Sequence, residues 1–333
     1  MNVGAPGTVD LPPFTPRWGL GNGHLMTVFA WARPRVFPDL PQPEARLFQT
    51  TADTQVLGHC YWQADRHTRP TLVALHGLEG RSDRHYMLGL ADQAWQRGWN
   101  AVLLNHRNCG DTEHLTPTLY HSGLTEDAFA VITELAAEGL PHFGVAGYSL
   151  GGNLTLRIAG ELATVHGRAD LPIRAVAAVS PTMDLHVCID AMERPINYPY
   201  QRNFLKDLRA RLNRKAARWP GRFDLTPLAA VRTIRQFDDA YTAPQAGFGN
   251  AANYYTKASA IRLIDRVTIP TLIVSAEDDP FVPGEQFRRP EVAGNPHVRV
   301  LVTDDGGHCG FVSKTGYWAE ETVMRFLAAF MPS

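Results

Sequence analysis

The feature that most constrains this chain is the nonapeptide at residues 145–153, Val-Ala-Gly-Tyr-Ser-Leu-Gly-Gly-Asn. An apolar run before it predicts a buried strand, and residues 150–162 carry leucine and isoleucine at helical spacing. Ser149 therefore lies at a strand-to-helix corner in the pattern Gly-x-Ser-x-Gly. Such a turn lifts the hydroxyl above the sheet edge, and the helix start offers free N–H groups. The pattern predicts a nucleophilic serine, with an ordinary glycine-rich turn as the alternative.

Length and composition limit what this corner belongs to. The 333 residues suffice for one large domain with an insertion or for two domains. A net charge of −1 gives no reason to expect a nucleic acid partner. The chain shows no signal peptide and no apolar run of about eighteen residues, so we expect a cytoplasmic protein. The 4 cysteines and 13 histidines lack ligand spacing, which argues against disulfides and against a metal site.

From residue 71 onwards, apolar segments alternate with amphipathic ones. Strands are expected at 71–75, 101–105, 142–146, 175–179, 271–275 and 299–302, and helices at 83–97, 125–138, 150–162 and 317–330. This alternation predicts an α/β fold with a mostly parallel sheet covered by helices on both faces. A hairpin of strands 45–50 and 55–62 precedes it, and the proline-rich segment 11–43 is expected to wrap the surface.

Two loops beside the serine are expected to bind an oxyanion. The sequence His-Gly-Leu at 76–78 follows the first parallel strand, at the edge where open α/β sheets bind ligands. In acyl-transfer enzymes of this architecture, that loop donates one backbone N–H and the residue after the nucleophile donates another. The expected donors are therefore the amides of Leu78 and Leu150.

A general base and an orienting acid are expected near the carboxyl end. The glycine-rich loop after the last expected strand presents His308, our candidate base. The acid should lie between serine and histidine in the sequence. We favour Asp279, because Pro280 fixes the backbone just after it. Asp278 is the nearest alternative, and the weaker alternatives are Asp304, Asp305 and Asp184.

Together these motifs resemble the YheT-like group of α/β-hydrolases, bacterial relatives of the animal and fungal ABHD-type esterases and acyltransferases. The resemblance covers nearly the whole chain and is carried by Trp18, Asn22-Gly23-His24 and Thr27, by residues 76–80, 105–110 and 147–153, and by a long block at 237–281. Asn253 and Asn108 depart from the family pattern, which has an acidic residue or threonine and a glycine there. The resemblance implies the α/β-hydrolase fold and cofactor-free ester hydrolysis or acyl transfer on small-molecule, often lipid-like, esters.

Residues 181–270 exceed what a crossover helix needs, so we expect an inserted helical cap. The expected division is a wrapping segment at 1–44, a core at 45–183 and 260–333, and a cap at 184–259. Within the cap, leucines recur at helical spacing among basic residues: Arg202, Lys206, Arg209, Arg211, Arg214, Lys215 and Arg218. The favoured interpretation is a helix with a solvated basic face. The alternative is that this face contacts an anionic membrane or an acyl carrier.

The predicted function is hydrolysis of carboxylic esters with short- to medium-chain or lipid-like acyl groups, through a Ser-His-Asp triad and an acyl-enzyme. A serine at the nucleophile position argues against dehalogenase and epoxide-hydrolase chemistry, which uses a carboxylate there. An acyltransferase, a lyase and a non-catalytic binding protein of the same fold are the alternatives. Tyr148 is a candidate substrate contact, and Tyr254 and Tyr255 are candidates for either the pocket or the core.

Overall fold

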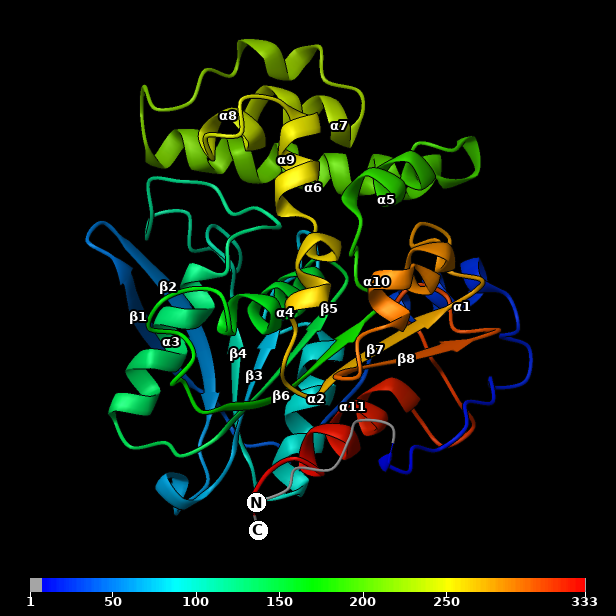
Figure 1. Ribbon diagram of the computed structural model, residues 1–333. Coiled ribbons are helices and arrows are strands. Elements are labelled where there is room, and N and C mark those ends of the chain that lie inside the picture. Colours follow the sequence, from blue (N-terminus) through cyan, green and yellow to red (C-terminus); the bar gives the residue numbers. More distant parts are fainter. Residues whose placement is uncertain (1–7, 333) are drawn as a thin grey trace.

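The computed structural model describes residues 8–332 and is built on an eight-stranded sheet of order β1-β2-β4-β3-β5-β6-β7-β8 (Figure 1). The strands are β1 (Glu44–Thr51), β2 (Thr54–Tyr61), β3 (Thr71–Leu75), β4 (Asn100–Leu104), β5 (Phe143–Tyr148), β6 (Ile173–Val179), β7 (Thr271–Ala276) and β8 (Val298–Thr303). The pairs β1–β2 and β2–β4 are antiparallel, and all the other pairs are parallel. The predicted mostly parallel α/β sheet is confirmed.

The strand register brings the predicted loops to one edge of the sheet. Gly147 of β5 pairs with Leu75 of β3, and Tyr148 pairs with Val179 of β6. The residues that follow these three strands therefore leave the sheet side by side. Ser149 comes directly after β5, so it lies next to the loop after β3.

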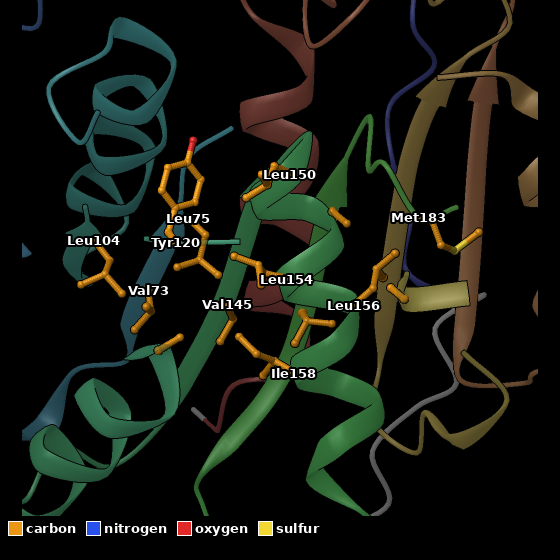
Figure 2. Close-up of a cluster of buried hydrophobic side chains, with 14 of the residues drawn as sticks. Val73, Leu75, Leu104, Tyr120, Val145, Leu150, Leu154, Leu156, Ile158 and Met183 are labelled. Atoms are coloured by element: carbon orange, nitrogen blue, oxygen red, sulfur yellow. The ribbon is translucent and has the colours of Figure 1, made fainter. Parts of the chain in front are cut away.

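Helices cover both faces of the sheet. On one face lie α3 (Glu126–Ala137) and α4 (Leu150–Leu162), and on the other lie α2 (His85–Gln96) and α11 (Trp318–Ala328) (Figure 1). Figure 2 shows Leu154 and Ile158 of α4 beside side chains of β3 and β5 in the larger apolar cluster. Fully burying one such side chain contributes about 1.5–3 kcal/mol. This packing holds the first turn of α4, and with it the corner at Ser149, against the sheet.

The N-terminal segment contains a helix that sequence patterning did not predict, α1 (Gly23–Ala32). The side chain of Asn22 caps it by accepting the N–H of Leu25 at 3.1 Å. Met26 is fully buried, which fixes α1 on the core. Residues 1–7 of the expected wrapping segment, and Ser333 of the expected core, lie outside the described residues.

A layer of helices follows β6 and lies over one end of the sheet (Figure 1). It comprises α5 (Leu185–Met192), η3 (Pro195–Asn197), α6 (Tyr198–Arg218), η4 (Thr226–Ala229), α7 (Ile234–Phe237), the π-helical turn η5 (Asp238–Thr242), α8 (Ala243–Gln245) and α9 (Ala251–Ala258). Asp184 caps the start of α5, and Ser259 ends α9. The shorter elements elsewhere are η2 (Arg66–Thr68), η6 (Ala260–Arg266), η7 (Gly284–Arg288) and α10 (Pro290–Ala293). Within residues 8–332 no helix has the length and apolar character needed to cross a bilayer.

Candidate active site

Ser149 adopts a backbone conformation that few residues other than glycine take. Its φ of 53° and ψ of −116° lie outside the regions favoured by residues with a Cβ atom. The flanking glycines are required by contact: a Cβ on Gly147 would lie 2.2 Å from the carbonyl oxygen of Gly151. A Cβ on Gly151 would lie 2.2 Å from the oxygen of Leu75. The corner between β5 and α4 therefore forms only with glycine at both positions.

His308 and Asp279 are brought together by loops that follow β8 and β7. Nδ1 of His308 lies 2.9 Å from Oδ2 of Asp279, whose side chain is fully buried. The other oxygen of Asp279 accepts the N–H groups of Phe281 at 3.1 Å and Val282 at 3.0 Å. Thr27 of α1 accepts the N–H of His308 at 2.8 Å, a contact that sequence reasoning missed. Backbone groups on both sides therefore fix the pair.

The surroundings of His308 favour its protonated form. Burial alone disfavours the charged imidazolium, but the carboxylate of Asp279 outweighs it and raises the pKa of His308 above its usual range. The rival acid Asp278 faces another way, since its Oδ1 accepts the N–H of Gly307 at 2.8 Å. Burial raises the pKa of Asp278. Asp184 is engaged elsewhere, as the cap of α5 and the partner of Arg289.

Leu78 and Leu150, whose amides are expected to bind an oxyanion, line the same cavity as Ser149. Neither the Leu78 nor the Leu150 N–H donates a hydrogen bond to another group within residues 8–332. The loop that carries Leu78 is held by His76, whose Nδ1 lies 2.8 Å from the oxygen of Gly77. The N–H of His106 donates to Nε2 of His76 at 3.1 Å, which leaves the His76 ring proton on Nδ1. Both amides are free to bind a ligand oxygen.

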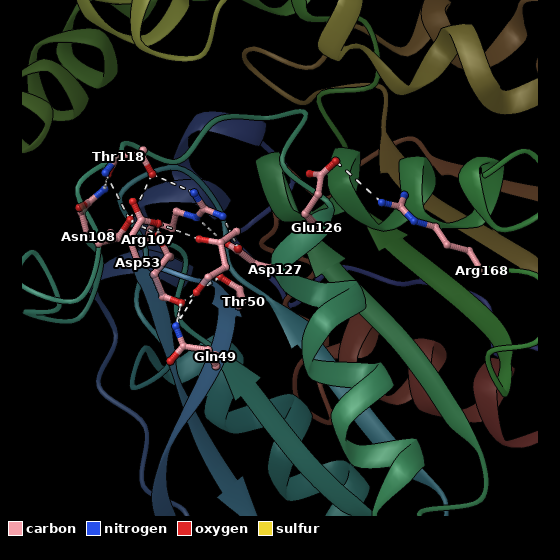
Figure 3. A network of polar contacts seen from close by, with 12 residues as sticks. Gln49, Thr50, Asp53, Arg107, Asn108, Thr118, Glu126, Asp127 and Arg168 are labelled. Carbon is pink, nitrogen blue, oxygen red and sulfur yellow. Dashed lines mark hydrogen bonds and ion pairs between the residues drawn. The ribbon is translucent and has the colours of Figure 1, made fainter. Parts of the chain in front are cut away.

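The loop after β4 is held by the buried ion pair between Arg107 and Asp127 (Figure 3). Arg107 donates to Asp127 at 2.6 Å and to Oγ1 of Thr118 at 2.8 Å. Asn108, where the family more often has glycine, has a φ of 67°. Asparagine is one of the few side-chain-bearing residues that tolerate this conformation, so the departure leaves the turn intact. This loop supports His106 and, through it, the loop of Leu78.

The cavity at Ser149 has a volume of about 80 Å³ and is closed on one side by the inserted helices. From the core it is lined by Leu78, Ser122, Ser149, Leu150, Thr182 and Phe281, and from the insertion by Leu185, Cys188, Ile189, Met192, Phe204, Leu208, Ile234, Asp238, Tyr254 and Tyr255. Tyr254 and Tyr255, which the sequence left open between pocket and core, both line the cavity. His308 is not itself among the lining residues, but its ring centroid lies 4.0 Å from that of Phe281, which does line the cavity.

Tyr148 is not part of this cavity, contrary to its expected contact with substrate. Its ring packs on the opposite face of the sheet, 4.9 Å from the ring of Tyr86, and the residue is 2% exposed. The reason is strand alternation: Tyr148 is the last residue of β5, and its side chain points toward α2 and α11. The structure therefore corrects this assignment.

Asn153 ties the corner to the insertion, a role that the sequence motif did not reveal. Its Nδ2 donates to the carbonyl oxygens of Ser122 at 2.7 Å and Ala258 at 3.0 Å. Its Oδ1 accepts the N–H of Ala260 at 2.8 Å. One buried amide thus joins the first turn of α4 to the end of α9.

The basic residues of α6 are not uniformly solvated, so that expectation was wrong for its buried members. Nε of Arg211 lies 2.8 Å from the carboxylate of Glu79, in the loop after β3, and both side chains are nearly buried. Lys215 is fully buried and donates to the backbone oxygen of Glu113 at 3.0 Å. Arg214 pairs with the side chain of Glu113 at 2.6 Å. The basic side of α6 is therefore partly used to fasten the insertion to the core.

Three or more histidine, cysteine or acidic side chains do not cluster in a metal-binding arrangement anywhere within residues 8–332. The structure thus gives Ser149 at the corner, the amides of Leu78 and Leu150 without a hydrogen-bond acceptor among the described residues, and the His308–Asp279 pair behind Phe281. These are the kinds of group that acyl transfer by nucleophilic attack requires.

This combination of fold and site defines a class, and comparison with known proteins gives the family. A family model described as "alpha/beta hydrolase fold" matches residues 70–315. The Escherichia coli K12 protein named "Putative esterase YheT" is 34% identical over 325 residues, which are 96% of this chain and 94% of the relative. The chain belongs to the α/β-hydrolase family, in its YheT-like group.

Other relatives are longer. Mouse phospholipase ABHD3 is 31% identical over 78% of this chain and 62% of its own length, and a monoacylglycerol lipase of Saccharomyces cerevisiae is 30% identical over 79% and 60%. The chain thus spans about three fifths of these two proteins. Among solved structures, the Pyrococcus furiosus esterase Pf2001 gives a TM-score of 0.57 at 17% identity, covering 90% of this chain and 99% of that one. That likeness concerns the fold alone.

Proposed function

We propose that this chain is a serine hydrolase that cleaves carboxylic esters, with Ser149 as nucleophile, His308 as general base and Asp279 as the group that orients it. The observation that carries the proposal is the convergence of a strained serine and two unpartnered amides on one cavity beside a buried His308–Asp279 pair. The relatives named as esterase, phospholipase and lipase support the same class of reaction.

The geometry suggests the order of proton transfers. Because Nδ1 of His308 is engaged by Asp279, Nε2 is the nitrogen left to take the proton of Ser149. The serine oxygen attacks the ester carbonyl, and the negative oxygen that forms is bound by the amides of Leu78 and Leu150. His308 then protonates the leaving alcohol, and water, activated in the same way, hydrolyses the acyl-enzyme. Asp279 stabilises the imidazolium throughout.

The size of the cavity favours small acyl groups. At about 80 Å³ it is far below the roughly 300–1,000 Å³ of pockets that enclose drug-sized ligands. Short-chain esters are therefore the preferred substrates in this arrangement. A lipid-like acyl chain requires the cap, residues 184–259, to shift relative to the core.

The test is hydrolysis of p-nitrophenyl esters of increasing acyl length by the wild type and by Ser149→Ala. We expect the highest kcat/KM for acetate and butyrate, and a loss of kcat of about 10⁴- to 10⁶-fold in the variant. Matched circular dichroism spectra and melting temperatures establish that both proteins are folded. Activity that persists in Ser149→Ala, or is absent from both proteins, would refute the proposal.

Acyl transfer to an alcohol is the second candidate, because the cavity is lined largely by apolar side chains that limit the access of water. The same acyl-enzyme would then react with an alcohol in place of water. Product analysis in the presence of glycerol or short alcohols distinguishes the two: an acyltransferase forms new ester faster than free acid, and a hydrolase does not.

Peripheral contact with an anionic membrane is proposed only for the outward-facing basic residues of α6. The exposed ones are Arg202, Lys206, Arg214 and Arg218. Each basic residue near such a surface contributes about 1 kcal/mol. Replacing Arg202, Lys206 and Arg218 with serine should weaken binding to vesicles rich in phosphatidylserine at low salt, whereas Arg66→Ser, away from α6, should not. Equal binding of all these proteins would remove membrane contact from the proposal.

A further inference from the structure

A buried carboxyl group lies in the wall of the cavity, away from the residues that perform the chemistry. Asp238 lines the cavity from the π-helical turn η5 and is 8% exposed. Placing a carboxyl among apolar side chains is costly unless the group is used. Single π-helical turns also occur frequently at functional sites. Both features call for an explanation of Asp238 beyond packing.

The neighbouring polar groups leave Asp238 as an available acceptor. The hydroxyl groups of Tyr254 and Ser122 bond to one another at 2.9 Å, so they satisfy each other. The hydroxyl of Tyr255 donates to Oδ2 of Asp238 at 2.8 Å. Thr242 forms a second side-chain hydrogen bond with Asp238. A carboxylate offers about four lone-pair sites, so these two contacts leave Asp238 with further acceptor capacity. A second polar atom of the wall, Oγ1 of Thr182, is buried and has no hydrogen-bond partner within residues 8–332.

The charges around Asp238 select the kind of ligand. Burial raises the pKa of Asp238 to about 6, while hydrogen bonds from Thr242 and Tyr255, and more weakly the guanidinium groups of Arg211 and Arg235, act in the opposite direction. Both arginines are already paired with other carboxylates, and a cationic ligand would lose its hydration among the apolar side chains of the cavity wall. An anionic group such as a phosphate would meet the negative carboxylate directly. A neutral hydroxyl group has neither difficulty and supplies the hydrogen that a carboxylate accepts.

We propose that Asp238, held by Tyr255, forms a subsite for a neutral hydroxyl group carried by the ester substrate. The proposal rests on the proposed function, because it assigns the substrate class of the same cavity: short esters with a free hydroxyl group a few atoms from the carbonyl. Asp238 is here a specificity-determining residue that takes no part in proton transfer. It selects among esters that the Ser149 site would otherwise treat alike.

The experiment compares two probes of matched size, 2-hydroxyethyl butyrate and propyl butyrate, with a larger cationic probe, butyrylcholine. We expect the wild type to favour the hydroxyethyl ester over the propyl ester by about tenfold in kcat/KM, the range of one hydrogen bond to a charged group. Asp238→Leu combined with Tyr255→Phe removes the carboxyl group and the tyrosine hydroxyl together, so that the hydroxyl of Tyr255 is not left buried and unpaired. In this double variant the ratio should fall to about one. Asp238→Asn, which weakens the acceptor while keeping its shape, should give an intermediate ratio and serves if the double variant does not fold.

Tyr241→Phe is the matched control, because Tyr241 belongs to the same turn but does not line the cavity. Its ratio should equal that of the wild type. A wild-type ratio near one, a ratio that the Asp238 variants leave unchanged, or a preference for butyrylcholine that depends on Asp238 would each overturn the hydroxyl subsite. Ser149-dependent hydrolysis of p-nitrophenyl butyrate would meanwhile continue to support the proposed function.

Binding separates the two proposals completely. In Ser149→Ala no turnover occurs, and calorimetry with the hydroxyethyl and propyl esters reports the subsite alone. Tighter binding of the hydroxyethyl ester that is reduced in Ser149→Ala/Asp238→Asn supports the subsite even if wild-type hydrolysis fails. Equal binding of both esters refutes the subsite even if hydrolysis succeeds.

Discussion

Two regions of the molecule hold their functional groups in different ways. One is the sheet edge, with the loops that follow β3, β5, β7 and β8, and the other is the cap above it, α5 to α9, which we call the roof. At the edge, the backbone fixes each reactive group: Ser149 by its φ and ψ, and Asp279 by the N–H groups of Phe281 and Val282. In the roof, side chains from separate helical elements hold one another, as Asp238 of η5 and Tyr255 of α9 do. Groups fixed by the backbone need no reorganisation when the reaction occurs, which suits residues that take part in catalysis. Side-chain contacts are exchangeable by single substitutions, which suits the selection of substrates.

The sharpest test of this difference is a pair of adjacent carboxylates at the edge. Asp279→Asn should lower kcat by about 10⁴-fold, because the amide holds the imidazole in the wrong tautomer. Asp278→Asn removes a carboxyl whose Oδ1 accepts an N–H from Gly307 and which has no contact with His308. Steady-state kinetics on p-nitrophenyl butyrate measures both. We expect Asp278→Asn to retain at least a tenth of wild-type kcat, and equal losses in the two variants would show that Asp279 is not the orienting acid.

The second largest effect is expected for the ion pair between Arg211 and Glu79, which fastens the roof to the sheet edge. Arg211→Met leaves Glu79 buried without its ionic partner, which should destabilise the protein by about 3–5 kcal/mol. Glu79 directly follows Leu78, and its N–H donates to the hydroxyl of Tyr120 at 3.0 Å. Loss of the ion pair should therefore also loosen the expected oxyanion loop and lower kcat more than it changes KM. Urea unfolding and steady-state kinetics at a temperature where the variant is folded measure the two effects.

Two further variants decide whether charge pairing is the cause. Glu79→Gln in the Arg211→Met background removes the unpaired charge and should recover part of the lost stability. Lys206→Met changes an exposed basic residue of the same helix and should alter stability by no more than about 0.5 kcal/mol. If Arg211→Met behaves like Lys206→Met, the roof is not fastened through this pair.

The same division explains what the sequence could and could not predict. Strands, face-covering helices and the corner at Ser149 follow from periodicity and from glycine spacing, which are local properties of the chain. The helix α1 escaped prediction because proline-rich flanks obscured its cap at Asn22. The pairing of Arg211 with Glu79 joins residues 132 positions apart, and no pattern distinguishes it from a solvated arginine. Tyr148 was misassigned because proximity to the nucleophile in sequence does not determine the face of a strand.

The pH dependence of the edge is the third prediction. Neutral His308 is the proposed base, so kcat/KM should rise with pH through the pKa of His308. Because Asp279 raises that pKa, the rise should extend above the ordinary histidine value of about 6.5. Asp279→Asn removes the charge responsible and should move the pKa down by about one unit or more, worth about 1.4 kcal/mol per unit. Nitrogen NMR of His308 in a Ser149→Ala background measures both values without turnover, and an unchanged pKa would contradict this role of Asp279.

The smallest expected effect concerns Tyr148, the neighbour of the nucleophile that faces away from the cavity. Its hydroxyl is buried and has no hydrogen-bond partner within residues 8–332, so Tyr148→Phe removes an unsatisfied polar group. Such a change should leave stability unchanged or raise it by about 1 kcal/mol. It should also leave kcat/KM for both butyrate esters within about twofold of the wild type, unlike the double variant at Asp238 and Tyr255. If Tyr148→Phe instead lowered kcat/KM strongly for only one of the two esters, residues of the sheet edge would also select the substrate. Catalysis by the edge and selection by the roof would then not be separate.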